Sequence, residues 1–452
     1  MLRRECFKVG NKYTKEQILK ITEEKDIKFI CLQFTDIFGF FKNVSITRTQ
    51  LKKALDNQCM FDGSSIEGFV RIEESDMYLH PDLDTFMIYP WSSNIGKVAR
   101  IICDVYTTDK KPFEGDPRYI LKKGLKEAES MGFTFNVGPE CEFFLFRNDK
   151  DGKPTVNTID SGSYFEFGPV DKGEEARRDI CLNLENMGFE IEASHHECAP
   201  GQHEIDFKYS DALNAADNIM SFKLAVRSIA DRHNLHATFM PKPLYGHAGS
   251  GMHINMSLSK NGKNAFYDET DERGLSHIAY NFIAGIIEHA EGMAGITNPL
   301  VNSYKRLVAG YEAPVYIAWS AKNRSPLIRI PAARGQSTRI ELRNPDSASN
   351  PYLALAVCLA AGLDGIKKDL TPPQPIDSNI FKMSDEERRQ SEAKSMPENL
   401  SIAIKKMKED EIIKQAIGDH AFKKYVIHKQ NEWNSYRKTI TDWETERYLG
   451  RY

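Results

Sequence analysis

The chain has 452 residues, of which 41% are hydrophobic and 27% charged, and its formal net charge is −4. This length predicts two or three domains with large hydrophobic cores, and the mixed charge argues against a nucleic-acid partner, which needs a concentrated basic face. The eight cysteines form no CxxC pair, and the first residues lack the apolar stretch of a signal peptide. The longest apolar run, 352–363, is shorter than the roughly 20 residues that cross a bilayer. We therefore expect a reduced, cytoplasmic protein without a membrane partner.

The N-terminal part, 1–112, is predicted to be a small domain of strands with one or two helices. Thr14 and Gln17 form a capping-box pattern, which marks the start of a helix that ends near Glu24. Two strands follow around the turn sequence DIFG, and the polar, glycine-containing stretch 62–69 is predicted to be a loop. After the first helix, the expected elements are strands 28–35 and 41–46, a helix over 49–57, and strands 85–89 and 98–105, with a domain boundary within 110–117.

The remaining part, 113–452, is predicted to be a larger domain, which makes the chain an α+β protein. Asp116 and Pro117 form an N-cap and first-turn pair, and Asp211 is a second N-cap. The expected helices are 117–132, 174–187, 212–233, 275–293 and 349–367, followed by charged helices from a capping box of Ser384 and Glu387 to the end. The expected strands are 134–146, 190–194, 202–209, 236–240, 252–258 and 337–343, with a loop over 302–314.

The strand 134–146 carries a pair of carboxylates in the sequence GPECEF. Side chains alternate along a strand, so Glu140 and Glu142 share one face and Phe143 lies on the other. Two like charges about 7 Å apart repel by roughly 2 kcal/mol at an effective dielectric constant of about 20. The pair therefore requires either open solvent, which is the usual explanation of an isolated ExE pattern, or a bound cation.

Three later strands repeat this division into an apolar face and a face of ligand-type side chains. The polar faces carry Glu204 and Asp206, then His253 and Asn255, then Arg339, Glu341 and Arg343. A curved antiparallel sheet would turn these faces into one cavity. The side chains expected to meet there are Glu140, Glu142, Glu197, Glu204, His253 and Glu341. Oxygen ligands with one nitrogen suit Mg²⁺ or Mn²⁺.

Arginines in the last third of the chain supply the opposite charge: Arg306, Arg324, Arg329, Arg339 and Arg343. Their planar donors suit carboxylates and phosphates, so metals and arginines together suggest phosphoryl transfer onto or near a carboxylate. The stretch GHAGSGMH lacks the lysine and hydroxyl residue of a P-loop, and neither HExxH nor GxSxG occurs. His195 and His196 are interpreted as packing and hydrogen-bonding residues.

Taken together, these residues resemble a type I glutamine synthetase. The matching stretches run over nearly the whole chain: DGSSIEGF, GPECEFF, HHECAPGQHEIDF, GSGMHINMS, NSYKRLVAGYEAPVYIAWSAKNRSPLIRIP and RIELRNPDSASNPYLA. The resemblance implies an N-terminal β-grasp domain, a catalytic domain with a curved antiparallel sheet flanked by helices, and a dodecamer of two hexameric rings with sites between subunits. It also implies the reaction: ATP-dependent ligation of ammonia to the γ-carboxylate of L-glutamate through a γ-glutamyl phosphate, giving glutamine, ADP and phosphate.

The resemblance further implies roles for individual residues. One metal ion would be held by Glu142, Glu197 and Glu204, and a second by Glu140, His253 and Glu341. Glutamate would be bound by Gly249, Arg306, Glu312, Arg324 and Arg343, and ATP by Glu192, Asn255, Ser257, Arg324 and Arg329. Arg324 would also act in catalysis, and Glu312 would close over the intermediate and take a proton from ammonium. Asp62 would reach a neighbouring subunit's site and help to bind and deprotonate ammonium.

Three positions depart from the family pattern. Ala248 stands where many relatives have asparagine, and Ala309 stands where proline is common. Phe381 occupies the place of a tyrosine that is adenylylated in one branch of the family. The chain therefore resembles the branch regulated by glutamine feedback, in which an arginine equivalent to Arg71 takes part. A nitrogen-regulatory protein is a candidate partner.

Two other functions stay open at this point. A γ-glutamyl ligase for an amine or polyamine would share every metal and ATP residue, but it should lack the acidic residue at Asp62. A catalytically inactive scaffold would have lost at least one metal ligand, and none is missing from the sequence.

Overall fold

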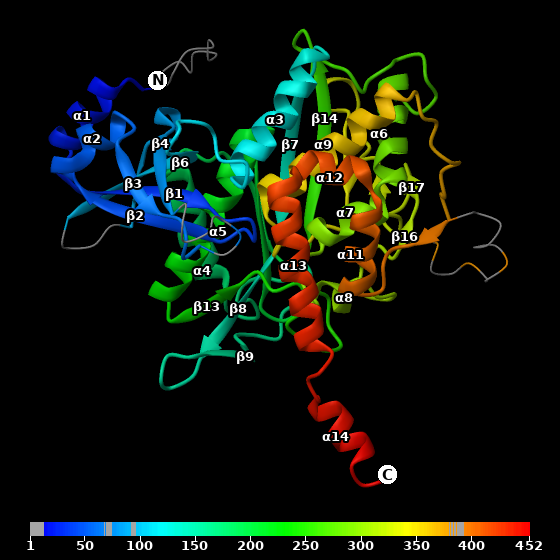
Figure 1. Ribbon diagram of the computed structural model, residues 1–452. Helices are drawn as coiled ribbons and strands as arrows, with labels where there is room; N and C mark the ends of the chain where they lie inside the picture. Colours follow the sequence, from blue (N-terminus) through cyan, green and yellow to red (C-terminus); the bar gives the residue numbers. More distant parts are fainter. Residues whose placement is uncertain are drawn as a thin grey trace.

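The computed structural model describes residues 13–66, 68, 75–91, 96–378, 380, 383, 386 and 393–452. The predictions for Arg71 and Phe381, and the capping box of Ser384 with Glu387, lie outside these residues. The described chain forms two parts with their own sheets, and Figure 1 shows the N-terminal part in blue beside the larger part in cyan to red.

The N-terminal part has a sheet with the strand order β2-β1-β6-β4-β3, and β5 pairs with β6. The β1–β6 pair is parallel and the other pairs are antiparallel. The core of this part includes Ile18, Leu32, Leu51 and Ile101. Its elements are α1 (Lys15–Glu24), β1 (Ile27–Thr35), β2 (Phe41–Thr47), α2 (Leu51–Leu55), β3 (Cys59–Asp62), β4 (Asp76–Pro81), β5 (Met87–Ile88) and β6 (Lys97–Thr107).

Sequence patterns predict most of this part. Thr14 and Gln17 form the predicted capping box of α1. The sequence does not predict β3 or β4. β3 has only four residues, of which half are exposed, and β4 ends in a proline. These two strands depend on pairing within the sheet rather than on a local signal.

The larger part begins with α3 (Pro117–Ser130), which Asp116 caps as predicted, and Asp211 likewise caps α5. Its strands are β7 (Thr134–Cys141), β8 (Phe143–Asn148), β9 (Pro154–Thr158), β10 (Ile191–His196), β11 (Gln202–Phe207), β12 (Ser210–Asp211), β13 (Leu235–Thr238), β14 (Met252–Lys260), β15 (Lys263–Asn264), β16 (Tyr316–Ile317), β17 (Trp319–Ser320), β18 (Ile328–Arg329), β19 (Ile340–Leu342) and β20 (Lys394–Ser395). The remaining helices are α4 (Glu174–Asn186), α5 (Ala212–Arg232), α6 (His277–Glu288), α7 (Ala290–Thr297), α8 (Ser303–Arg306), α9 (Pro351–Lys367), α11 (Leu400–Glu409), α12 (Glu411–Ile417), α13 (Asp419–Tyr436) and α14 (Asp442–Tyr448).

The strands that position the site belong to two sheets. One has the order β12-β7-β14-β19-β18-β17, with β15 on β14, and the other has the order β10-β11-β8-β13, with β9 on β8. All these pairs are antiparallel except β17–β18, which is parallel. β11 lies against β7, so the two sheets meet at these strands.

The predicted strand 134–146 is wrong in one respect, because it is divided between the two sheets. β7 ends at Cys141 and pairs with β14, whereas β8 starts at Phe143 and pairs with β11 and β13. Glu142 lies at the division, where its backbone N–H donates to the carbonyl of Gly251 over 3.1 Å. The chain thus changes sheet at one of the two glutamates of GPECEF.

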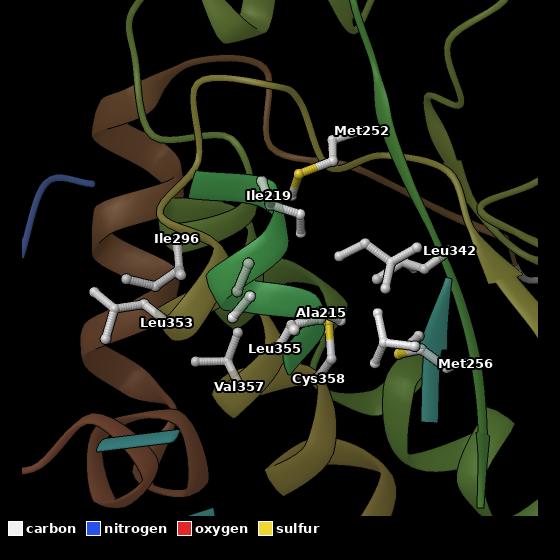
Figure 2. Close-up of a cluster of buried hydrophobic side chains, with 14 of the residues drawn as sticks. Ala215, Ile219, Met252, Met256, Ile296, Leu342, Leu353, Leu355, Val357 and Cys358 are labelled. Atoms are coloured by element: carbon white, nitrogen blue, oxygen red, sulfur yellow. The ribbon is translucent and has the colours of Figure 1, made fainter. Parts of the chain in front are cut away.

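Helix α9 forms the centre of the larger core. Most of its residues are buried, and it packs against α3, α5, α6, α7 and α12. A Cβ at Gly365 would lie 2.1 Å from the carbonyl oxygen of Asn281, so α6 and α9 are in backbone contact there. Figure 2 shows Val357 and Cys358 of α9 in one cluster with Met256 of β14.

Three further predictions need correction. The predicted helix 275–293 is two helices, α6 and α7, which meet at His289. The imidazole of His289 lies 2.8 Å from an Asp410 carboxylate oxygen and 3.1 Å from one of Asp364. The predicted loop 302–314 contains α8, and the predicted strand 337–343 is shortened to β19.

The domain boundary near residue 112 stays a prediction. The core of the N-terminal part includes residues from Ile18 to Phe113, and the larger core includes Ile37 and then residues from Ile120 onward. Among the described residues, no helix has the length and apolar character needed to cross a membrane.

Candidate active site

A cavity of about 560 Å³ is lined by residues from both sheets of the larger part. It contains all six predicted metal ligands: Glu140, Glu142, Glu197, Glu204, His253 and Glu341. It also contains six residues predicted for the substrates: Gly249, Arg306, Glu312, Arg324, Arg329 and Arg343. Residues from widely separated segments therefore line one cavity, as the strand patterns predict.

The first group of potential metal ligands consists of Glu140, His253 and Glu341. One donor atom of each lies within 4.8 Å of the others. The register of β7 with β14 places Glu140 directly opposite His253, and its carboxylate lies 3.1 Å from His253 Nδ1. Glu341 comes from β19, which pairs with the other edge of β14. Three neighbouring strands therefore present these side chains to one point.

The second group differs slightly from the set that the resemblance implies. Donor atoms of His195, Glu197 and Glu204 lie within 4.8 Å of one another. His195 Nε2 is 2.8 Å from Glu197 Oε1, so this histidine lines the cavity although sequence reasoning assigned it to packing. Glu142 lies in the same cavity, and its Oε2 accepts hydrogen bonds from Gln202 Nε2 (2.7 Å) and from the Gly251 N–H (3.0 Å).

The crowding of carboxylates changes their acidity. Burial, and then the charge of Glu197, raise the pKa of Glu142 to about 8. Burial, and then the charge of Asp206, raise the pKa of Glu204 well above its usual range. Burial and the charge of Glu140 raise the pKa of Asp206 to about 6. The protein thus supplies too little positive charge to keep all of these carboxyl groups ionised at neutral pH.

Glu140 behaves differently because it has a direct partner. Burial acts to raise its pKa, but the hydrogen bond and charge of His253 outweigh burial and lower the pKa to about 2. The amide of Asn255 also donates to Glu140 over 2.8 Å. Glu140 is therefore held as a carboxylate beside Glu341.

This donor set fits divalent cations. Each group supplies carboxylate oxygens and one imidazole nitrogen within bonding reach of a common point, which is the ligand chemistry of Mg²⁺ and Mn²⁺. Two cations would also neutralise the charge that now raises the pKa of Glu142 and Glu204.

Binding of Mg²⁺ is therefore expected to release protons and to weaken as the pH falls. The folded pKa of Glu142 lies above the ordinary value for a carboxyl group, so below about pH 8 a cation must displace a proton that the metal-free site holds. The rise in melting temperature caused by Mg²⁺ should be larger at about pH 8 than at about pH 6, measured by calorimetry. Glu142→Gln should flatten this dependence, and a Mg²⁺ effect that does not change with pH would contradict the assignment.

The arginines of the cavity make two kinds of contact. Arg329 and Arg343 bind Glu341, at 2.6 and 2.5 Å. Arg306 instead donates to the backbone carbonyls of Arg343 and Asn344, so one of its roles is to hold the chain after β19. Arg339 lies outside this cavity and donates to the side chain of Asn255 over 3.0 Å.

A second cavity of about 710 Å³ adjoins the first, because Glu140, Ala193 and Asp206 line both. The predicted ATP residues divide between them. Glu192, Asn255 and Ser257 line the second cavity, and Arg324 and Arg329 line the first. A molecule that spans both would have one end among the carboxylates and arginines, and the other among neutral polar groups of β14.

Two loops contribute lining residues to the first cavity. Gly249 fits only as glycine, because a Cβ there would lie 2.2 Å from the Pro241 carbonyl oxygen. Ala248 also lines the cavity, and Ala309 is exposed nearby in sequence to Glu312. Glu312 has a positive φ of 59°, a strained backbone for a residue other than glycine.

One predicted site residue lies apart from both cavities. Asp62 is exposed at the end of β3, and its carboxylate accepts a hydrogen bond from the Ser64 N–H over 2.8 Å. Neither cavity of this chain includes it.

Sequence reasoning missed some residues of the site. Gln202 shares the polar face of β11 with Glu204 and with Asp206, which the strand pattern places there, so the same alternation predicts its direction. Tyr164 and Phe165 also line the cavity, from the segment between β9 and α4, and no local pattern marks them. His196, by contrast, is fully buried and bonds Asp160 and the Glu197 carbonyl, as a packing residue should.

Comparison with known proteins covers almost the whole chain. The family model described as glutamine synthetase, catalytic domain, matches residues 114–448, and the one described as glutamine synthetase, beta-grasp domain, matches residues 26–108. A glutamine synthetase of Clostridium saccharobutylicum is 63% identical over 441 residues, which cover 98% of this chain and 100% of the relative. One of Staphylococcus aureus strain Mu50 is 59% identical over 97% of this chain and 99% of the relative.

Solved structures agree with the fold. A cryo-electron microscopy structure of Plasmodium falciparum glutamine synthetase superposes with a TM-score of 0.86 at 25% identity, covering 98% of this chain and 100% of that one. A complex of GmaS with ADP superposes with a TM-score of 0.87 at 34% identity, covering 96% and 99%. The fold and the cavity are thus those of an enzyme of the ligase class. The chain belongs to the glutamine synthetase family.

Proposed function

We propose that this chain joins ammonia to the γ-carboxylate of L-glutamate at the cost of ATP, giving glutamine, ADP and phosphate, and so serves nitrogen assimilation. The observation that carries this proposal is the meeting of six ligand-type side chains with arginines in one cavity. The 63% identity to a glutamine synthetase over nearly the whole chain supports the same reaction.

The metal roles follow from the two groups of donors. Glu140, His253 and Glu341 would hold one Mg²⁺ or Mn²⁺, and Glu142, Glu197 and Glu204 a second, with His195 close to the latter group. Bound cations would neutralise the phosphate oxygens of ATP and the γ-carboxylate, which otherwise repel each other. Glu140, Glu204, His253 and Glu341 would hold these cations from strands, and Glu142 and Glu197 would hold them from the connections between strands.

The arginines and loops would bind and orient the substrates. We assign glutamate to Gly249, Arg306, Arg324 and Arg343, and ATP to Glu192, Asn255, Ser257, Arg324 and Arg329. The adjoining cavities support this division, and the ADP complex of GmaS supports a nucleotide site. Arg324 would further offset the negative charge that develops as the phosphoryl group is transferred.

Carboxylates are poor electrophiles, so the γ-carboxylate is activated as a γ-glutamyl phosphate that ammonia then attacks. This acyl phosphate hydrolyses in water, which requires a loop that closes over it. Glu312, in such a loop, would exclude water and accept a proton from ammonium. Asp62 would act in the site of a neighbouring subunit, where its carboxylate binds ammonium and helps to deprotonate it.

Asp62→Ala is expected to weaken the use of ammonium more than that of hydroxylamine. Hydroxylamine is the better nucleophile and is neutral near pH 7, so it depends less on a carboxylate that binds and deprotonates a cation. The ratio of kcat/KM for ammonium to that for hydroxylamine should fall by about 10-fold or more. Asp76→Ala, at the position that pairs with Asp62 across β3 and β4, is the matched control. Equal losses with both nucleophiles would remove the role assigned to Asp62.

One assay separates the proposed reaction from its alternatives. Phosphate release is measured with glutamate, ATP and Mg²⁺, and with ammonium, methylamine or putrescine as the nitrogen donor. We expect release with ammonium alone. Faster release with either amine would favour an amine or polyamine ligase, and no release with any donor, in protein that binds ADP, would favour an inactive scaffold.

Assembly and regulation are also proposals. We expect a cytoplasmic homo-oligomer, a dodecamer of two hexameric rings with sites between subunits, since Asp62 lies outside its own chain's cavities. The domains are assigned to 1–112 and 113–452. Feedback by glutamine through Arg71, and contact with a nitrogen-regulatory protein, complete the proposal.

A further inference from the structure

A third cavity, of about 480 Å³, lies where the two parts of the chain meet. It is lined by the turn 37–41 of the N-terminal part and by α5, β13, the start of α9 and α13 of the larger part. It shares no lining residue with the two cavities of the proposed catalytic site. Its volume is in the range of small-molecule sites.

The cavity contains a buried amine without a carboxylate partner. Lys223 is only 7% exposed, and its Nζ makes one hydrogen bond, 3.1 Å long, to the carbonyl oxygen of Ser349. An ammonium group has three protons to donate. Within the described ranges of the chain, no aspartate or glutamate forms an ion pair with it. Burial lowers the pKa of Lys223 to about 8, which reflects the missing negative charge.

A second cation lies one turn further along α5. Arg227 lines the same cavity, and its guanidinium carbon is 5.3 Å from the centroid of the Phe239 ring. Its guanidinium likewise has no carboxylate partner in the part of the chain that the structure describes. Lys223 Nζ is 5.7 Å from the same ring, so the two cations flank one aromatic side chain. This places two positive charges at one wall of the cavity.

The other charged groups of the cavity compensate each other. Lys429, on α13, is paired with Glu432 at 2.8 Å. Glu432 also accepts a hydrogen bond from the Val301 N–H. The excess charge of the cavity is therefore positive, and Lys223 and Arg227 supply it.

Much of the remaining lining is apolar. It includes Phe38, Met220, Phe239, Ile296 and Leu353. Ile296 and Leu353 lie next to each other in Figure 2, at the edge of the main core. A ligand that fits this lining needs an apolar body as well as a negative group.

We propose that this cavity is a second small-molecule site, which takes an organic carboxylate with an apolar or aromatic body. The carboxylate pairs with Lys223 inside the cavity and with Arg227 nearer to solvent, and the apolar body contacts Phe239 and Leu353. Ser347 also lines the cavity, and its hydroxyl lies 2.7 Å from the backbone oxygen of Glu142. One lining residue of this cavity is thus hydrogen-bonded to the backbone of a proposed metal ligand.

The test uses 3-phenylpropionate as the probe and its neutral amide as the control. Binding to the full-length oligomer is measured by isothermal titration calorimetry, with Mg²⁺, ADP and saturating glutamate present so that the catalytic site is filled. We expect the acid to bind at least about 10-fold more tightly than the amide, because a charge-assisted hydrogen bond in a buried site is worth that much. Equal binding of acid and amide, or no detectable binding of the acid under these conditions, would overturn the proposal.

Variants locate the site. Lys223→Met should lower the affinity for 3-phenylpropionate by about 10-fold or more, and Arg227→Gln should lower it by a smaller factor. Arg232→Gln, on the same helix but outside the cavity, should change nothing. Arg227 is exposed, so its variant reports on the site even if Lys223→Met does not fold. Unchanged affinity in Arg227→Gln, or inorganic phosphate binding more tightly than the acid, would show that the ligand class or the site is wrong.

Discussion

Glu341→Gln is expected to lower the rate of glutamine formation by at least about 10³-fold. The substitution removes a negatively charged metal ligand from the point where phosphoryl transfer would occur. Glu341 is 1% exposed, and its two oxygens bind Arg329 and Arg343. Glutamine keeps the shape of the side chain but not its charge. The measurement is phosphate release and glutamine formation with ammonium at saturating Mg²⁺.

The control for this variant is Glu129→Gln, an exposed position of α3. It should keep normal turnover, and size-exclusion chromatography should give the same oligomer for both variants. The Mg²⁺-dependent rise in melting temperature should shrink in Glu341→Gln only. Near-normal turnover with an intact oligomer would contradict the role of Glu341 as a metal ligand.

The largest effect on stability is expected at Arg118, which connects the two parts of the chain. Its guanidinium binds Asp82 and Asp104 of the N-terminal part, both at 2.7 Å, and Asp217 of α5 at 2.9 Å. The Arg118 side chain is only 3% exposed. Arg118→Met would leave three carboxylates close together without their shared cation, which should cost about 3–5 kcal/mol of unfolding free energy.

Lys122→Met is the matched control for Arg118→Met. Within the described part of the chain, the ion pair of Lys122 is with Asp104 alone, and its side chain is 31% exposed, so its loss should cost no more than about 1 kcal/mol. Unfolding in guanidinium is followed by fluorescence and by circular dichroism. If Arg118→Met costs no more than the control, then Arg118 does not hold the two parts together.

The sequence predicts well which side chains of each strand point toward the site, because they alternate with buried ones. Ile254, Met256 and Leu258 are fully buried, and the intervening residues of β14 line the two cavities. The pattern is reliable here because burying one face of a strand fixes which side chains point away from the core. The same reasoning applies to β7 and β11.

The division of the strand at Glu142 could not be predicted, because no local feature marks it. Apolar residues continue through Phe143 and Phe144, which a single strand would equally explain. The division depends on distant partners, because β7 pairs with β14 whereas β8 pairs with β11 and β13. His195 escaped prediction for a related reason, since its place opposite Glu204 depends on how β10 pairs with β11.

The pairing of Glu140 with His253 has a consequence for folding fidelity. The two side chains meet only when β7 and β14 adopt one alignment, and a shift by a single residue would send each to the opposite side of its strand. A misaligned chain would consequently lose the proposed metal site even if it were compact. The affinity for Mg²⁺ would then distinguish subunits in which β7 and β14 are correctly aligned from misfolded ones.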